Sequence, residues 1–102
     1  MLRIGDLTLD AAKREVTRGG KPVPLSPREF SLLEYMMRHP DQVLTRTQIA
    51  EHIWSFDYYG ASNVVDVYMG YLRRKLAGGD GKPLIHTVRG VGYRMNAPSV
   101  EE

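Results

Sequence analysis

Near its C-terminal end the chain reads Ser62-Asn-Val-Val-Asp-Val-Tyr-Met-Gly-Tyr-Leu-Arg-Arg-Lys-Leu76 and, after a short loop, Leu84-Ile-His-Thr-Val-Arg-Gly-Val-Gly-Tyr-Arg-Met95. In the first segment apolar residues recur at the spacing of one helix face, which predicts a helix that buries Val65, Met69, Leu72 and Leu76. The second segment has two short runs of strand-forming residues around Arg89-Gly90, a pattern typical of a hairpin. We therefore expect a helix followed closely by a β-hairpin.

The outer face of the predicted helix carries side chains that are suited to duplex DNA. On a helical wheel this face holds Asn63, Val67, Gly70, Tyr71 and Arg74. Asn and Arg can hydrogen-bond to base edges in a major groove, and a valine methyl can contact thymine methyls. Flanking cations can bind phosphates, with Arg73 on one side and Lys75, near Val64 and Tyr68, on the other. The helix alone is also consistent with an ordinary surface helix that carries incidental charges.

The hairpin places Arg89 at its tip, followed by glycines 90 and 92, which keep the backbone slim. An exposed arginine at a narrow tip can enter a minor groove, where the negative potential is enhanced. Thr87 is placed to donate a hydroxyl hydrogen bond to a phosphate, and Tyr93 is expected to be a core or hinge aromatic. In isolation, the Arg-Gly pair also fits a solvated turn.

The preceding residues predict short strands followed by two capped helices. Leu2–Ile4, Leu7–Leu9 and Glu15–Arg18 alternate in polarity between turn residues, which predicts a small antiparallel sheet. Ser26-Pro-Arg-Glu29 and Thr45-Arg-Thr-Gln48 are capping boxes, and each predicts a helix start. Strands, three helices and a hairpin in this order predict a helix-turn-helix core with an added β wing.

Length and composition indicate one small domain with its positive charge gathered at one end. The 102 residues suffice for a single core. We expect one domain over residues 1–95, followed by a disordered tail over 96–102. Within the domain, the expected segments are a sheet over 1–25, helices over 26–76, a flexible connector over 77–83 and a wing over 84–95. Net charge is +2, but residues 61–95 hold six basic and two acidic residues, which suits an anionic partner or a solvated charged face. Without cysteine, a signal-peptide pattern or a long apolar run, we expect a cytoplasmic protein.

Four motifs resemble the OmpR/PhoB-type winged-helix effector domain, the DNA-binding output half of two-component response regulators. They are Leu25-Ser-Pro-Arg-Glu-Phe30, Leu44-Thr45-Arg46 leading to His52-Ile-Trp54, Val65-Asp-Val67 with Leu72-Arg-Arg-Lys75, and Thr87-Val-Arg-Gly-Val-Gly-Tyr-Arg94. The resemblance covers nearly the whole chain. It implies an α+β fold, a winged helix-turn-helix with an N-terminal four-stranded antiparallel sheet, three helices and a C-terminal β-hairpin wing. It also implies sequence-specific binding of double-stranded DNA, regulation of transcription and no enzymatic activity.

The resemblance further implies roles for single residues and for partners. The third helix enters the major groove, and Arg89 reaches the minor groove. Positions that meet bases match Val67, Tyr68 and Tyr71, and positions that approach the DNA backbone match Asn63, Val64, Arg73, Thr87 and Trp54. Arg74 and Lys75 complete the DNA-binding candidates. The loop that can contact RNA polymerase corresponds to Ser55, Phe56, Asp57, Tyr58, Tyr59 and Gly60. Direct repeats in the DNA, a receiver domain and a sensor kinase are implied as partners, and the isolated domain is expected to be monomeric off DNA.

This chain departs from some relatives at two positions in the third helix. Some relatives carry arginines at the positions where this chain has Gly70 and Tyr71, so fewer cations of this chain face the groove. We expect its sequence preference to differ, with Val67, Tyr68 and Tyr71 against thymine methyls.

Other function classes stay open or are disfavoured by the residue pattern. One alternative is a winged helix that binds a protein, which would show negligible salt-dependent DNA binding. Another is a module that binds RNA, or DNA of any sequence, which would show no preference between sequences. The histidines, His39, His52 and His86, lack metal-ligand spacing. We therefore expect no metal site, no cofactor and no catalytic residues.

Overall fold

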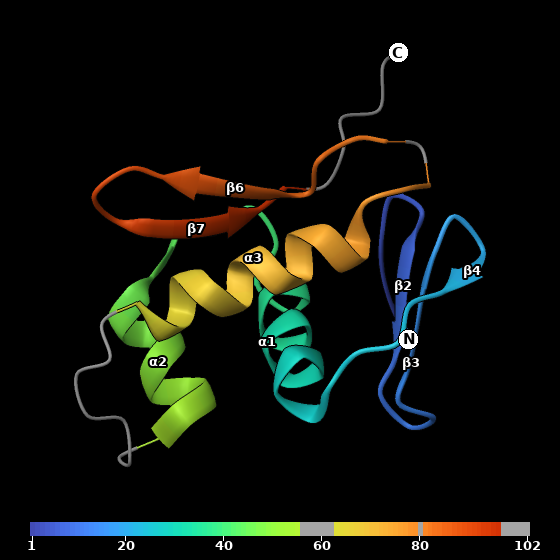
Figure 1. Ribbon diagram of the computed structural model, residues 1–102, viewed down its shortest axis with the longest axis horizontal. Coiled ribbons are helices and arrows are strands. Elements are labelled where there is room, and N and C mark those ends of the chain that lie inside the picture. Colours follow the sequence, from blue (N-terminus) through green and yellow to red (C-terminus); the bar gives the residue numbers. More distant parts are fainter. Residues whose placement is uncertain (56–62, 80, 97–102) are drawn as a thin grey trace.

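The computed structural model describes residues 1–55, 63–79 and 81–96, which form two small sheets and three helices (Figure 1). The first sheet pairs four antiparallel strands in chain order: β1 (Leu2–Ile4), β2 (Leu7–Asp10), β3 (Glu15–Arg18) and β4 (Lys21–Pro22). The helices are α1 (Pro27–Met37), α2 (Arg46–Trp54) and α3 (Val64–Leu76). The chain continues into the hairpin of β6 (Ile85–Val88) and β7 (Gly92–Met95). The predicted order of strands, helices and hairpin is confirmed.

Both predicted capping boxes start a helix. The Ser26 hydroxyl accepts from the Glu29 backbone N–H at 3.2 Å, and the Glu29 carboxylate accepts from the Ser26 backbone N–H at 2.9 Å. Thr45 and Gln48 make the same reciprocal pair at 3.0 and 2.8 Å. These bonds satisfy backbone donors that have no partner within a helix, and they fix where α1 and α2 begin.

The wing sheet has a third strand that the sequence analysis did not predict. Strand β5 (Leu44–Thr45) pairs with β7, so the order in this sheet is β5-β7-β6. Thr45 lies opposite Gly92, and a Cβ atom at residue 92 would stand 2.0 Å from the Leu44 carbonyl oxygen. Gly92 was expected to keep the hairpin tip slim, but it is buried in β7, where only a glycine permits this approach of β5.

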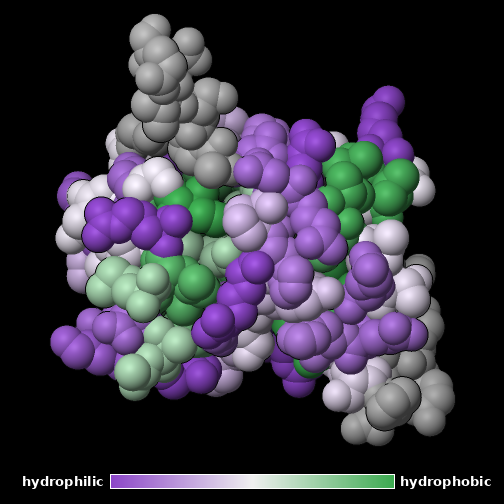
Figure 2. Space-filling model, turned by 180° about the vertical axis from the view of Figure 1, so that it is seen from behind, coloured by the Kyte–Doolittle hydropathy of each residue, from purple (hydrophilic) through white to green (hydrophobic). Residues whose placement is uncertain are grey.

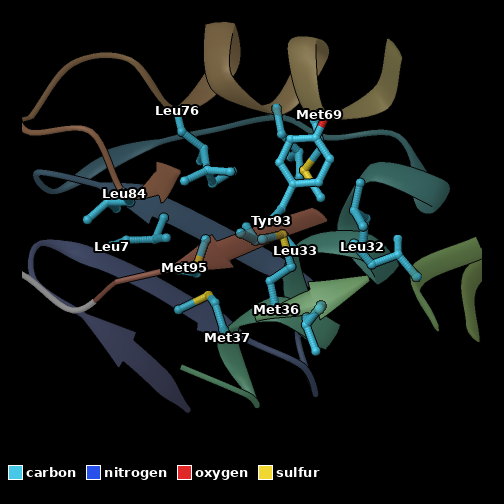
Figure 3. Close-up of a cluster of buried hydrophobic side chains, with 14 of the residues drawn as sticks. Leu7, Leu32, Leu33, Met36, Met37, Met69, Leu76, Leu84, Tyr93 and Met95 are labelled. Carbon is cyan, nitrogen blue, oxygen red and sulfur yellow. The ribbon is translucent and has the colours of Figure 1, made fainter. Parts of the chain in front are cut away.

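The core joins α1, α3 and the wing (Figure 3). All four apolar residues of the predicted α3 stripe are buried, and Figure 3 shows Met69 and Leu76 directed toward side chains of α1 and β7. Tyr93 and Met95 contribute from β7, and Leu33 contributes from α1. Because α3 lies between α1 and the hairpin, its buried stripe fixes which face of the helix stays outside (Figure 1).

Arg18 connects the first sheet to the far end of α3. Its side chain is only 5% exposed, and its Nε lies 2.7 Å from Asp6 Oδ1. Its two terminal nitrogens donate to the carbonyl oxygens of Leu76, at 3.0 Å, and Lys82, at 2.7 Å. The connector after α3, expected to be flexible, is thus bound at Lys82 to the N-terminal sheet, which lies beside the end of α3 (Figure 1).

The surface away from the viewer of Figure 1 is mostly hydrophilic, with smaller apolar areas toward both sides (Figure 2). Within the described ranges, no helix has the length and apolar character needed to cross a membrane. The same residues contain no cluster of three or more His, Cys, Asp or Glu side chains that could hold a metal ion.

Candidate nucleic-acid interface

The outer face of α3 exposes apolar side chains as well as polar ones. Val67 is 38% exposed and Tyr71 is 39% exposed, and both lie opposite the buried stripe. The wing tip exposes Val91 at 44%, a residue that the sequence analysis did not single out. Among the described residues, four large hydrophobic side chains are exposed, and these are three of them. The outer face of α3 and the wing tip therefore each present apolar area to solvent beside their polar side chains.

Aromatic contacts hold the tyrosines of this face in place. The Tyr68 ring meets Trp54 edge-on, with centroids 5.2 Å apart, and meets Tyr71 in the same manner at 5.4 Å. The Arg28 guanidinium lies over the Trp54 ring at 5.3 Å, and the Arg74 guanidinium lies over the Tyr71 ring at 5.4 Å. Ring pairs and cation–π contacts each contribute about 1 kcal/mol. Tyr71 is therefore ordered although it is exposed, whereas Tyr68 is half-buried.

Arg73 joins the helix to the wing. One of its terminal nitrogens donates to the Thr87 hydroxyl at 2.7 Å and to the Ile85 carbonyl oxygen at 3.3 Å. Arg73 and Thr87, two of the residues predicted to contact the DNA backbone, thus lie side by side on exposed surface. Because the Thr87 hydroxyl accepts from Arg73, its own proton remains available to an anion.

Lys75, another predicted cation of this face, points to a different neighbour. Its ammonium nitrogen lies 2.6 Å from Glu29 Oε1, at the start of α1. Glu29 is 4% exposed, so the pair ties α3 to the capping box of α1. Burial opposes ionisation of this carboxyl, but hydrogen bonds from Lys75 and Ser26 outweigh it and lower the pKa of Glu29.

Beneath the wing, Asp66 of α3 accepts hydrogen bonds from one donor in α2 and one in β7. The Tyr93 hydroxyl and the Arg46 Nε both donate to Asp66 Oδ1, the latter at 2.9 Å. The guanidinium groups of Arg46 and Arg73 lie near the Tyr93 ring, at 5.2 and 5.5 Å from its centroid. Tyr93 is 4% exposed, so the prediction of a core or hinge aromatic is confirmed. This cluster fixes the wing against α2 and α3.

The cluster shifts the protonation equilibria of its members. Burial alone would raise the pKa of Asp66, but the hydrogen bonds from Tyr93 and Arg46 and the charge of Arg46 hold it below its ordinary value. Burial, followed by the bond to Asp66, raises the pKa of Tyr93. The bond to Asp66 is also the main cause that raises the pKa of Arg46. Around neutral pH the cluster therefore holds a carboxylate, a guanidinium and a neutral phenol.

We expect the free energy of unfolding to fall as the pH drops below about 4. The pKa values of Asp66 and Glu29 are lower in the folded chain than in the unfolded one. Their stabilising contribution is therefore complete above the unfolded pKa and is lost as the pH falls through the folded pKa. Urea denaturation between pH 7 and pH 3 measures this loss. A variant with both Asp66→Asn and Glu29→Gln should show a shallower loss, and an unchanged profile would contradict the assignment.

The tip of the wing is a tight turn with Arg89 exposed on it. The Val91 backbone N–H donates to the Val88 carbonyl oxygen at 3.0 Å. Gly90 has a φ of +75°, which this turn position requires and which side chains other than glycine rarely adopt. The predicted turn at Arg89-Gly90 is confirmed, and Val91 accompanies the arginine there.

The remaining candidates lie around the end of α2. Trp54 is half-buried on the core and contacts Tyr68, as described above. Asn63 precedes α3 and is exposed, and Val64 is half-buried in its first turn. Ser55 ends α2 with a φ of +60°. The other predicted polymerase-contact residues, Phe56, Asp57, Tyr58, Tyr59 and Gly60, lie outside the described residues.

A helix-turn-helix core with a β wing, and with an exposed mixed surface on its last helix and wing, defines the winged-helix class of domains. Residues 20–95 match the family described as transcriptional regulatory protein, C terminal. The chain belongs to this family, which confirms the resemblance to OmpR/PhoB-type DNA-binding domains. The family is one of transcription regulators and not of enzymes.

Individual relatives agree with this membership. The chain is 52% identical over 97 residues to the transcriptional regulatory protein TrcR of Mycobacterium tuberculosis, covering 95% of this chain and 37% of that protein. It is 53% identical over 93 residues to the response regulator MprA of Mycolicibacterium vanbaalenii, covering 90% and 40%. The solved DNA-binding domain of Klebsiella pneumoniae RstA, in complex with the RstA box, superimposes with a TM-score of 0.84 at 33% identity, covering 95% and 97%. The chain spans about two fifths of the length of these two curated relatives.

Proposed function

We propose that this chain binds double-stranded DNA in a sequence-specific manner, as the output domain of a two-component response regulator, and that it regulates transcription. The observation that carries the proposal is the continuous surface that the Arg73–Thr87 bond makes from α3 and the wing. This surface combines exposed apolar side chains, cations and hydroxyl groups. Family membership and the likeness to an RstA domain solved with its DNA box add independent support.

In this proposal α3 lies in the major groove. Val67 and Tyr71 face the bases, and Tyr68 supports Tyr71 from the side. Apolar groups of this kind favour thymine methyls over the polar edges of other bases. Asn63, Val64 and Trp54, near the start of α3, approach the DNA backbone, and Arg74 flanks Tyr71.

Arg73, Thr87 and Arg89 complete the contact to the DNA strands. Arg73 and Thr87 bind phosphate groups and set the register of α3. Arg89 enters the adjacent minor groove from the wing tip. We expect Lys75 to contribute less than these residues, because the Glu29 carboxylate already neutralises its charge.

Further partners follow from the relatives. Paired sites in direct repeat would raise the affinity of a domain that is monomeric off DNA. The stretch from Ser55 to Gly60 is the proposed contact to RNA polymerase. We also propose a receiver domain and a sensor kinase as partners, which is consistent with the chain spanning about two fifths of the length of its curated relatives.

Replacing Arg89 by alanine tests the proposal. We expect affinity for a selected direct-repeat duplex to fall about tenfold and the preference for A/T pairs in the flanking minor groove to disappear. Fluorescence anisotropy with the wild type and the variant, at several salt concentrations, measures both effects. Wild-type binding should weaken with a log–log slope of roughly −0.9 per phosphate neutralised.

The control is Arg38→Ala, which removes the same charge from the end of α1, where Arg38 pairs with Glu34 at 2.8 Å. Its affinity should stay near the wild-type value. Equal affinity and preference in Arg89→Ala would refute the placement of the wing. Binding without salt dependence would favour a protein-docking module, and equal binding to scrambled duplexes would favour a non-specific one.

A further inference from the structure

Gly70 stands in the middle of α3 although the fold does not require glycine there. Its backbone is helical and does not have a positive φ. Among the described residues outside the adjoining helix backbone, a Cβ atom at this position would have a single neighbour within 4 Å, the Nη1 of Arg74 at 3.8 Å, which is ordinary contact. Glycine inside a helix is less stable than alanine by about 0.5–1 kcal/mol. Helix α3 thus carries a destabilising residue that its own packing does not explain.

The position of Gly70 links this residue to the outer face. It lies three residues after Val67 and four before Arg74, so these two side chains are its neighbours toward the middle of the outer face, and Asp66 and Arg73 lie on its other side. Val67 and Tyr71 are the exposed apolar residues of α3. The missing side chain therefore leaves a notch beside Val67, and among the described residues the Arg74 guanidinium is the side-chain group that lies within 4 Å of the place a Cβ atom would take.

We propose that Gly70 is a specificity-determining residue, and that its notch receives the 5-methyl group of a thymine. This inference rests on the proposed placement of α3 in the major groove. A helix without a Cβ at this point can approach a base edge more closely by the width of a methyl group. The exposed methyl groups of Val67 beside the notch favour a methyl group over the polar edges of cytosine, guanine and adenine. The contact with the Tyr71 ring holds the Arg74 guanidinium at the end of the notch before any DNA arrives.

The experiment combines Gly70→Ala with removal of single thymine methyls from the DNA. Each thymine of the selected duplex is replaced in turn by deoxyuridine, which lacks only the methyl group. For the wild type, we expect one position in each half-site at which this replacement weakens binding about fourfold, the value of one buried methyl group. Gly70→Ala should bind the thymine duplex about tenfold more weakly and should not distinguish thymine from deoxyuridine at that position.

Thermal unfolding separates this effect from damage to the fold. Gly70→Ala should raise the melting temperature, because alanine favours the helix. The matched control is Ser31→Ala on the exposed side of α1, which should also raise it while leaving DNA affinity unchanged.

Three results would overturn the inference. Unchanged affinity and unchanged methyl discrimination in Gly70→Ala would show that the notch is empty in the complex. Weaker binding with unchanged discrimination would place sugar or phosphate, and not a methyl group, against Gly70. A melting temperature below the wild-type value would show that the fold itself needs glycine there. In each case the proposed function stands as long as the wild type prefers its selected duplex; loss of that preference would instead refute the proposed function.

Discussion

Replacing Gly92 by alanine is expected to lower the free energy of unfolding by about 3 kcal/mol, the upper end of the usual cost of overpacking. The added Cβ would meet the Leu44 carbonyl oxygen at 2.0 Å and two further backbone atoms, of Leu44 and Thr45, at 2.9 Å. Backbone atoms cannot move aside as a flexible side chain can, so β5 must separate from β7. Urea denaturation followed by circular dichroism measures the change.

The same substitution at Gly70 serves as the control, because it should change stability in the opposite direction. Separation of β5 should also loosen the wing, since β7 carries Tyr93 and β5 leads into α2 at Arg46. DNA affinity should therefore fall in Gly92→Ala even at a temperature where the variant stays folded. A variant with wild-type stability would show that β5 and β7 do not pair as described.

Arg18→Ala is expected to lower the free energy of unfolding by about 3–5 kcal/mol, the usual result of removing one partner of a buried ion pair. The variant loses the ion pair with Asp6 and the hydrogen bonds to the carbonyl oxygens of Leu76 and Lys82. The last carbonyl groups of α3 then lose a cationic donor at the negative end of the helix dipole. Equilibrium urea denaturation measures the effect.

Arg38→Ala is the matched control for this substitution, because Arg38 also pairs with a carboxylate but its side chain is 53% exposed. An exposed pair contributes at most about 1 kcal/mol, so this variant should remain close to the wild type. Equal losses in the two variants would mean that burial does not distinguish the two ion pairs. The N-terminal sheet would then not depend on Arg18 for its attachment to α3.

Local signals account for the parts of the fold that the sequence predicts well. The capping boxes at Ser26 and Thr45 involve residues three positions apart, so a short stretch of sequence contains the complete interaction. The buried stripe of α3 follows from helical periodicity, and the wing turn follows from Arg89-Gly90 between two strand-forming runs. Each of these features depends on neighbours along the chain.

The missed features depend on residues that are distant in the sequence. Strand β5 is only two residues long, and its partner is β7, almost 50 positions later. Arg18 meets Leu76 across 58 positions, and Arg46 meets Asp66 across 20. The partner of Lys75 at the candidate site could not be predicted for the same reason. Its position in α3 indicates a cation that is available to DNA, but Glu29, 46 positions earlier, lies beside it in the folded chain. The one sequence signal for the Asp66 cluster is an acidic residue in the first turn of an otherwise basic helix.

The bond between Arg73 and Thr87 has a consequence for how the domain selects DNA. Because it joins α3 to the wing within the domain, the distance between α3 and the wing tip at Arg89 is set before any duplex is bound. In the proposed complex, with α3 in the major groove and Arg89 in the neighbouring minor groove, this fixed distance would match one spacing between the two grooves. A duplex whose grooves are spaced differently must deform to fit, and the energy of that deformation selects against it at base pairs the protein never touches.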